Sequence, residues 1–71
     1  MILVTGATGY VGRNLAARLA RRGDQVRCLV RRGSSKLRLL KDLPVELAYG
    51  DVTDEASLAQ AMEGADAVVH T

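Results

Sequence analysis

Short apolar runs alternate along the chain with segments of helical spacing. Met1–Thr5 is an apolar, partly β-branched run that stops at Gly6, a pattern typical of a buried strand. Runs of the same kind recur at Gln25–Val30, Val45–Tyr49 and Ala65–His70. We therefore expect four strands, and Val26, Cys28 and Val30 on one face of the second.

The segment Val11–Arg22 predicts the first helix. Val11, Leu15 and Leu19 recur every four positions, with Ala16 and Ala20 beside them, which indicates an apolar stripe facing the core. Gly23 fits the left-handed position that ends many helices.

Two further segments predict shorter helices. Lys36–Leu43 stops at Pro44, a residue that disfavours helical backbone before it. Thr53 is a suitable N-cap for a helix whose buried positions are Leu58 and Met62.

Strands that alternate with helices predict an α/β fold with a parallel sheet and right-handed crossovers. The 71 residues allow a single small domain. Apolar residues make up 48%, too many for a disordered chain, and no run is long enough to span a membrane. Cys28 and His70, each the only residue of its type, cannot make a zinc site. We expect a soluble, cytoplasmic protein that does not bind membranes.

Charge is divided unequally between the two halves of the chain. All eight arginines lie between Arg13 and Arg38, whereas five of the eight acidic residues follow Gly50. The basic half favours an anionic ligand or nucleic acid. The alternative is a solvated helix face, to which Arg18, Arg21 and Arg22 would belong.

The glycine-rich loop after the first strand is the motif that carries chemistry. A glycine at Gly6 allows a sharp turn, at Gly9 a close approach to a pyrophosphate, and at Gly12 close packing of helix on sheet. The helix start then offers N–H groups to phosphates. The remaining residues of this cradle contribute mainly backbone: Ala7, Thr8, Tyr10 and Val11. The alternative is a glycine-rich turn that binds no ligand.

The string Thr-Gly-x-x-Gly-x-x-Gly over residues 5–12 resembles the short-chain dehydrogenase/reductase superfamily. It is most similar to the extended and atypical branches, which include NAD(P)-dependent epimerases and dehydratases and NmrA-like proteins. The resemblance implies a Rossmann-like three-layer half-fold with strand order 3-2-1-4. It also implies that residues 1–71 are an N-terminal dinucleotide-binding segment, incomplete relative to the family.

The end of the second strand bears on the choice of cofactor. An acidic residue at this place binds the ribose 2′-OH of NAD, whereas arginine accommodates the 2′-phosphate of NADP. Here Arg31 and Arg32 follow Val30, so we expect NADP, with NAD possible as the alternative. The two arginines could also be solvated loop charges. Arg13 is a further candidate near the phosphates.

The resemblance also implies an adenine contact after the third strand. Asp51 and Val52 match the family's acid–hydrophobe pair, in which the carboxylate accepts from the adenine amine and the backbone donates to the ring. Local capping of the loop is the alternative for Asp51. His70, at the end of the fourth strand, is interpreted as a structural residue rather than a catalyst.

The Tyr-x-x-x-Lys pair that the resemblance implies for catalysis is not found. Asn14 follows Tyr10 by four residues, and Thr53 follows Tyr49. We therefore expect the NADP(H)-binding portion of a reductase, epimerase or dehydratase-like protein, without catalytic residues of its own. Alternatives are a non-catalytic NAD(P)H-sensing or interaction module and, less favoured, a nucleic-acid-binding domain. Partners would be the dinucleotide, and either a missing C-terminal part or a second copy covering an apolar sheet face.

Overall fold

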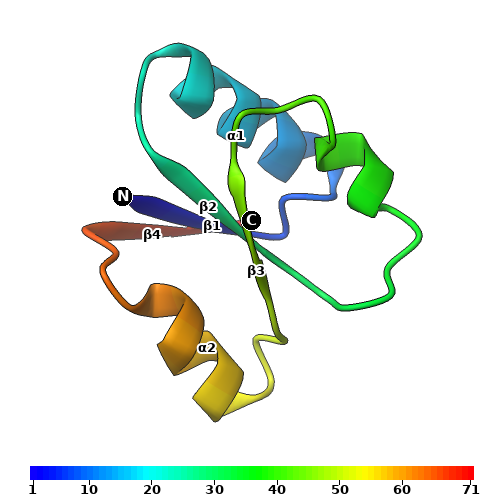
Figure 1. Ribbon diagram of the computed structural model, residues 1–71, viewed down its shortest axis with the longest axis vertical. Coiled ribbons are helices and arrows are strands. Elements are labelled where there is room, and N and C mark those ends of the chain that lie inside the picture. The colour runs from blue at the N-terminus through cyan, green and yellow to red at the C-terminus, as the bar shows by residue number, and fades with distance from the viewer.

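The computed structural model describes all 71 residues, which form a parallel four-stranded sheet between helices (Figure 1). The strand order is β3-β2-β1-β4, which confirms the expected α/β fold and order. The strands are β1 (Ile2–Thr5), β2 (Val26–Val30), β3 (Glu46–Tyr49) and β4 (Ala67–His70).

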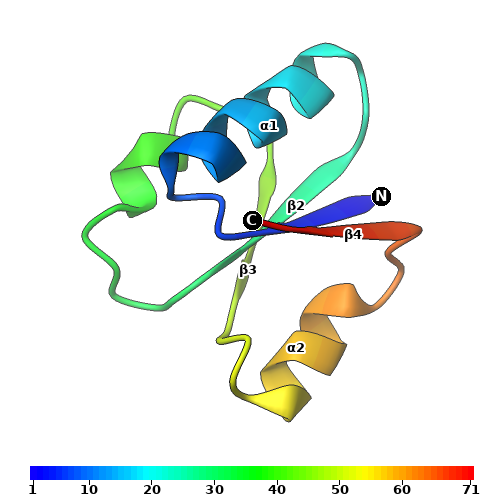
Figure 2. The same ribbon diagram turned by 180° about the vertical axis from the view of Figure 1, so that it is seen from behind.

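The two faces of the sheet carry different helices. Helix α1 (Tyr10–Arg21) and the short 3₁₀ helix η1 (Leu37–Leu40) lie on one face, and α2 (Glu55–Met62) lies on the other (Figures 1 and 2). The side chains of each strand alternate between these faces. The larger core cluster lies under α1 and η1: Val4, Ala7, Ala16, Val26, Cys28, Val30 and Leu40. Leu3, Leu29 and Ala61 form the cluster under α2.

The buried side of α1 matches the expected stripe in part, since Ala16 is fully buried and Leu19 and Ala20 pack against the core. Val11 is 67% exposed, so its assignment to the core was wrong, and Leu15 is only partly buried. The residues that α1 buries completely are small: Gly12, Ala16 and Ala17. Small side chains face the sheet because they let the helix axis come closer to the strands than leucine or valine would.

The predicted helix Lys36–Leu43 was wrong in type and extent, since only Leu37–Leu40 is helical and it is a 3₁₀ helix. No side chain caps its start. A segment this short gains too few hydrogen bonds to offset helix nucleation. Leu40, 2% exposed, anchors it to the core instead.

Helix α2 begins at a different cap from the one predicted. The side chain of Asp54 accepts hydrogen bonds from the backbone N–H groups of Ala56 and Ser57, so Asp54 is the N-cap and the prediction of Thr53 was wrong. Threonine and aspartate are both good capping residues, and Asp54 has this role because the helix starts one position later than predicted. Ala61, and not the 42% exposed Met62, is buried against the sheet.

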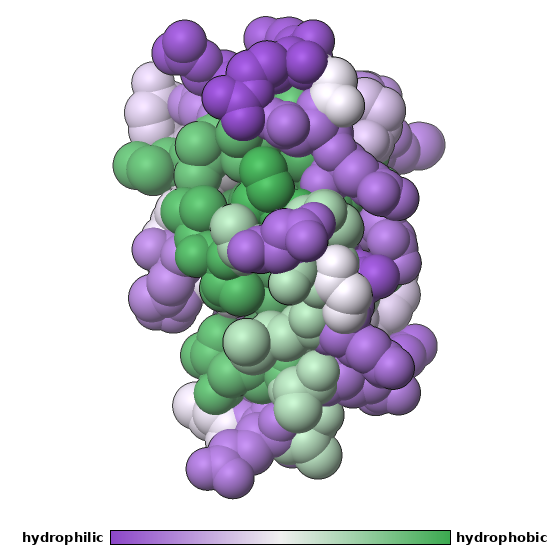
Figure 3. All heavy atoms as spheres, turned by 90° about the vertical axis from the view of Figure 1, so that its left-hand side faces the viewer, coloured by the Kyte–Doolittle hydropathy of each residue, from purple (hydrophilic) through white to green (hydrophobic).

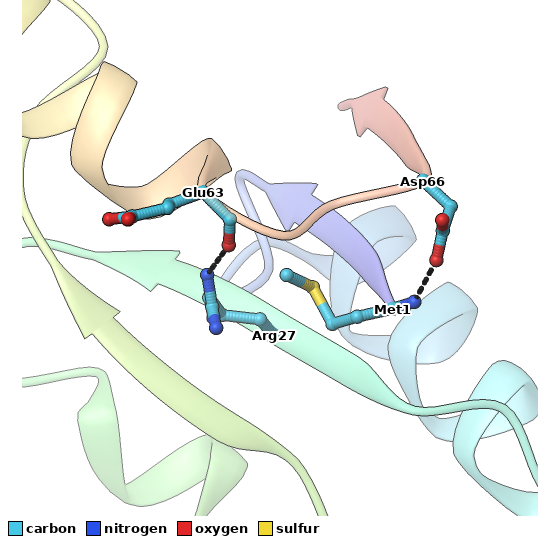
Figure 4. A network of polar contacts seen from close by, with 4 residues as sticks. All are labelled: Met1, Arg27, Glu63 and Asp66. Carbon is cyan, nitrogen blue, oxygen red and sulfur yellow. Dashed lines mark hydrogen bonds and ion pairs between the residues drawn. The ribbon is translucent and has the colours of Figure 1, made fainter.

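Two polar contacts fasten the end of α2 and the start of β4 to the sheet (Figure 4). Arg27 on β2 donates through Nη1 to the carbonyl oxygens of Ala61 and Glu63, each at 2.8 Å. Its positive charge thus meets the negative end of the α2 dipole. The amino group of Met1 pairs with the carboxylate of Asp66 at 2.5 Å. The Met1–Asp66 pair thus adds to the ladder that holds β4 beside β1.

Part of the apolar surface remains exposed. Figure 3 looks from the side on which β1 and β4 begin, and it shows a continuous apolar band bordered by polar residues. Val68 on the edge strand β4 is 43% exposed. That a partner covers such a surface stays a prediction. Helix α1, the longest, has 12 residues, and none of the helices combines the length and apolarity needed to cross a bilayer.

Candidate functional site

The glycine loop between β1 and α1 is closely packed. Gly6 has a φ of +68°, in the left-handed region that favours glycine. A Cβ atom built on Gly12 would lie 2.2 Å from the carbonyl oxygen of Gly6. The first turn of α1 therefore rests directly on the loop, and this approach requires glycine at position 12.

The start of α1 presents backbone N–H groups without a side-chain cap. Gly9 is the N-cap residue, with extended backbone and no side chain to accept from the helix, and no acidic residue occupies the first turn. N–H groups of a first turn have no partners inside the helix and, together with the helix dipole, favour an anion. The neighbouring side chains do not fill this position. Tyr10 is 86% exposed, whereas Ala7 is buried.

The loop that follows β2 supplies positive charge. Arg31, Arg32 and Lys36 are all exposed. Ser34 folds this loop locally, because its hydroxyl oxygen accepts from the backbone N–H of Lys36 at 3.2 Å. Three cations thus lie within six residues of the end of β2.

Asp51 follows β3 and is held in a tight turn. Its Oδ1 accepts from the backbone N–H of Thr53 at 2.9 Å and from the Thr53 hydroxyl at 2.8 Å. These bonds lower the pKa of the Asp51 carboxyl; desolvation opposes them in part, and the charge of Arg31 makes the smallest contribution, which also lowers the pKa. No hydrogen bond within the chain involves Oδ2 of Asp51.

Ser57, on the first turn of α2, fixes the same turn. Its Oγ lies 3.0 Å from the backbone nitrogen of Asp51, from which it accepts, and 3.1 Å from the Asp51 carbonyl oxygen. A Cβ atom on Gly50 would lie 2.8 Å from Ser57 Oγ. Sequence reasoning missed Ser57. A hydroxyl residue three positions after the cap of α2 was the available signal.

These three loops meet in one cleft of about 670 Å³. They meet because parallel strands bring their carboxyl ends to the same edge of the sheet. Of the predicted residues, Gly6, Thr8, Arg31, Arg32, Asp51 and Val52 line the cleft. The other predicted residues, Ala7, Gly9, Tyr10, Val11 and Gly12, do not line it. The cleft also includes residues that were not predicted: Leu29, Gly33, Ser34, Ser35, Lys36 and Gly50.

Two other candidates have structural partners. Arg13 donates through Nε to the carbonyl oxygen of Leu39 at 2.7 Å, so it ties α1 to η1. His70 shares a hydrogen bond of 2.5 Å between its Nδ1 and the hydroxyl of Thr5. This contact joins the ends of β1 and β4, and that His70 is structural rather than catalytic stays a prediction.

Taken together, a parallel sheet of order 3-2-1-4, a glycine loop leading into a helix, and a basic cleft at the carboxyl edge define a Rossmann-like domain of the short-chain dehydrogenase/reductase class. Residues 2–71 match the family described as "NAD dependent epimerase/dehydratase family". The chain belongs to that family.

Comparison with individual proteins gives the same class. The chain is 48% identical over 69 residues to "Sterol demethylase protein B" of Methylococcus capsulatus, covering 97% of this chain and 21% of that protein. The solved structure "AtPrR2 with NADP+ and (+)pinoresinol" superposes with a TM-score of 0.86 at 33% identity, covering 97% of this chain and 24% of the other. The Bordetella bronchiseptica enzyme WbmH in complex with NAD+ gives a TM-score of 0.82 at 33% identity, covering 99% and 24%. The chain thus spans about a fifth of the length of the curated relatives it matches.

Proposed function

We propose that the cleft binds a nicotinamide dinucleotide and prefers NADP(H) to NAD(H). The observation that carries the proposal is the convergence of the glycine loop, a cationic loop and Asp51 on one space of about 670 Å³. One of the similar solved structures is described with NADP+ and another with NAD+. The preference for NADP(H) over NAD(H) therefore rests on this chain's own residues.

The pyrophosphate would bind at the start of α1. Gly9 is exposed, and a Cβ atom there would meet only the Gly6 carbonyl oxygen, at 3.4 Å. The space beside Gly9 is therefore open to a phosphate that approaches the backbone. The binding groups are the backbone atoms of the loop, namely those of Gly6, Ala7, Thr8, Gly9, Tyr10, Val11 and Gly12.

The adenosine end would bind between the loops after β2 and β3. Arg31, Arg32 and Lys36 offer cationic donors to a 2′-phosphate, and a guanidinium can bind phosphate through two parallel hydrogen bonds. Asp51 is the only acidic residue in the cleft lining. Its free Oδ2 would accept from the adenine amine, and the Val52 backbone would donate to the ring. The local turn at Asp51 and adenine binding are thus compatible, because they use different oxygens.

The activity proposed for the whole protein is that of a reductase, epimerase or dehydratase. Family membership supports this class. Within residues 1–71 no tyrosine is followed four positions later by lysine, so we expect these residues to contribute cofactor binding and positioning rather than acid–base chemistry.

The test is calorimetric titration of the protein with NADP+ and with NAD+. We expect NADP+ to bind about 10- to 100-fold more tightly, since hydrogen bonds to charged groups contribute roughly 1.5–3 kcal/mol. Arg31→Ala should remove most of this preference and leave NAD+ binding unchanged. Arg18→Ala is the matched control, because Arg18 is an exposed arginine on α1 outside the cleft.

The same titration separates the alternatives. Folded protein that binds neither dinucleotide would refute the proposal, and equal affinities would refute the preference. Dinucleotide binding by the whole protein without turnover of any reductase, epimerase or dehydratase substrate would favour the sensing module. Binding of nucleic acid with a steep salt dependence would favour the alternative of a nucleic-acid-binding domain.

A further inference from the structure

The guanidinium of Arg32, which lines the cleft, lies over the ring of Tyr49. The guanidinium carbon of Arg32 lies 4.6 Å from the centroid of the Tyr49 ring, within the range of a cation–π contact. Tyr49 is the last residue of β3 and pairs in register with Val30, the last residue of β2. The parallel register therefore places the ring beside the loop that carries Arg32.

The Tyr49 ring is the only partner of the Arg32 guanidinium among ion pairs, side-chain hydrogen bonds and cation–π contacts. Neither the ion pairs nor the side-chain hydrogen bonds of the chain include Arg32. By contrast, Arg13, Arg22 and Arg27 are held by carbonyl or carboxylate oxygens. Arg32 is thus oriented by an aromatic face, while its N–H groups stay free.

The surroundings of the stacked pair are suited to a phosphate. A hollow of about 440 Å³ beside the pair is lined by Arg31, Arg32 and Tyr49 and by two carboxylates, Asp51 and Asp54. The Asp54 carboxylate is engaged as the cap of α2. Arg31, Arg32 and Asp51 also line the main cleft. Stacking uses the flat face of a guanidinium, whereas phosphate is bound by its edge. One arginine can therefore make both contacts at once.

We infer that Tyr49 is a positioning residue that holds Arg32 ready for the 2′-phosphate of the cofactor. The inference rests on the proposed NADP(H) site and adds a residue that does not itself touch the phosphate. Because the ring restricts the Arg32 side chain before binding, less side-chain freedom is lost when the phosphate arrives. Tyr49 would then contribute to NADP(H) affinity and not to NAD(H) affinity.

The experiment compares Tyr49→Leu with Tyr49→Phe by titration with NADP+ and NAD+. An exposed cation–π contact corresponds to a factor of about 2 to 5 in affinity. We expect Tyr49→Leu to weaken NADP+ binding by this factor and to leave NAD+ binding unchanged. Tyr49→Phe keeps the ring and should bind both dinucleotides as the unaltered protein does.

A double-mutant cycle shows whether Tyr49 acts through Arg32. In an Arg32→Ala background, Tyr49→Leu should have no further effect on NADP+ affinity. The inference is overturned if Tyr49→Leu keeps full NADP+ affinity, if it weakens NAD+ equally, or if its effect persists without Arg32. A different result would refute the proposed cofactor site: the unaltered protein would then bind neither dinucleotide or bind both with equal affinity.

Discussion

Gly12→Ala tests the central structural claim, which is that α1 must lie directly against the glycine loop. The added methyl would meet the Gly6 carbonyl oxygen at 2.2 Å and the Thr71 hydroxyl at 2.6 Å. The Gly6 oxygen belongs to backbone in a tight turn, so it cannot rotate away. The start of α1 would have to shift by about 1 Å or more to restore ordinary contact.

The expected cost follows from two opposing effects. Overpacking a close contact costs about 1–3 kcal/mol, whereas alanine in place of glycine favours a helix by up to about 1 kcal/mol. We therefore expect a net loss of about 1–2 kcal/mol. For a domain of this size, the midpoint of thermal unfolding would fall by roughly 4–16 °C.

Gly9→Ala is the matched control. Gly9 has φ of −79° and ψ of 168°, a conformation that alanine adopts readily, and its added Cβ would make only a 3.4 Å contact. We expect its unfolding midpoint to stay close to that of the unaltered protein. Its methyl would project into the space assigned to the pyrophosphate, so NADP+ affinity should fall by about 10-fold or more, the equivalent of one lost phosphate hydrogen bond.

Circular dichroism melting and calorimetric titration of both variants complete the test. Gly12→Ala should lose stability and binding, whereas Gly9→Ala should lose binding alone. A Gly12→Ala variant that melts at or above the temperature of the unaltered protein would refute the close-approach argument. A Gly9→Ala variant with full NADP+ affinity would refute the assigned phosphate position.

Three further predictions concern stability. Burial raises the pKa of the Cys28 thiol to about 11, so the folded state keeps its proton longer than the unfolded state. The contribution of the buried thiol to the free energy of unfolding should therefore be fully present below about pH 8.5 and fall by about 3 kcal/mol as pH rises through 11. Denaturant titrations across this range would detect the fall. Asp54→Ala removes the cap of α2 and should cost about 1 kcal/mol, measured by thermal melting, with a smaller loss in Thr53→Ala. The charge and hydrogen bond of the Met1 amino group lower the pKa of Asp66, so its contribution is present above about pH 4 and is lost as pH falls below that value. Melting curves between pH 5 and 2 should therefore show a steeper acid loss in the unaltered protein than in Asp66→Asn, and equal slopes would contradict this reasoning.

The sequence by itself determined the class of fold and the loops that meet in the cleft. Period-two and helical spacing are local properties, so they marked four strands and two of the three helices within one or two residues at most ends. The glycines of the loop predict this close packing directly, because only glycine fits where one stretch of backbone lies against another. The choice of Arg31 and Asp51 came from the family resemblance, and the structure shows both in one cleft, because residues after parallel strands meet at one edge of the sheet.

Only the tertiary structure decided which side chains are buried and which partners they find. Val11 lies on the apolar spacing of α1 yet is exposed, because the helix turns Gly12, Ala16 and Ala17 toward the sheet. Lys36–Leu43 has the composition of a helix, but it becomes a short 3₁₀ helix because one buried leucine, and not a continuous face, fixes it to the core. The Arg32–Tyr49 stack joins residues 17 positions apart, and neither carries a local signal for the other. Such contacts depend on strand register, which the packing of the whole sheet sets.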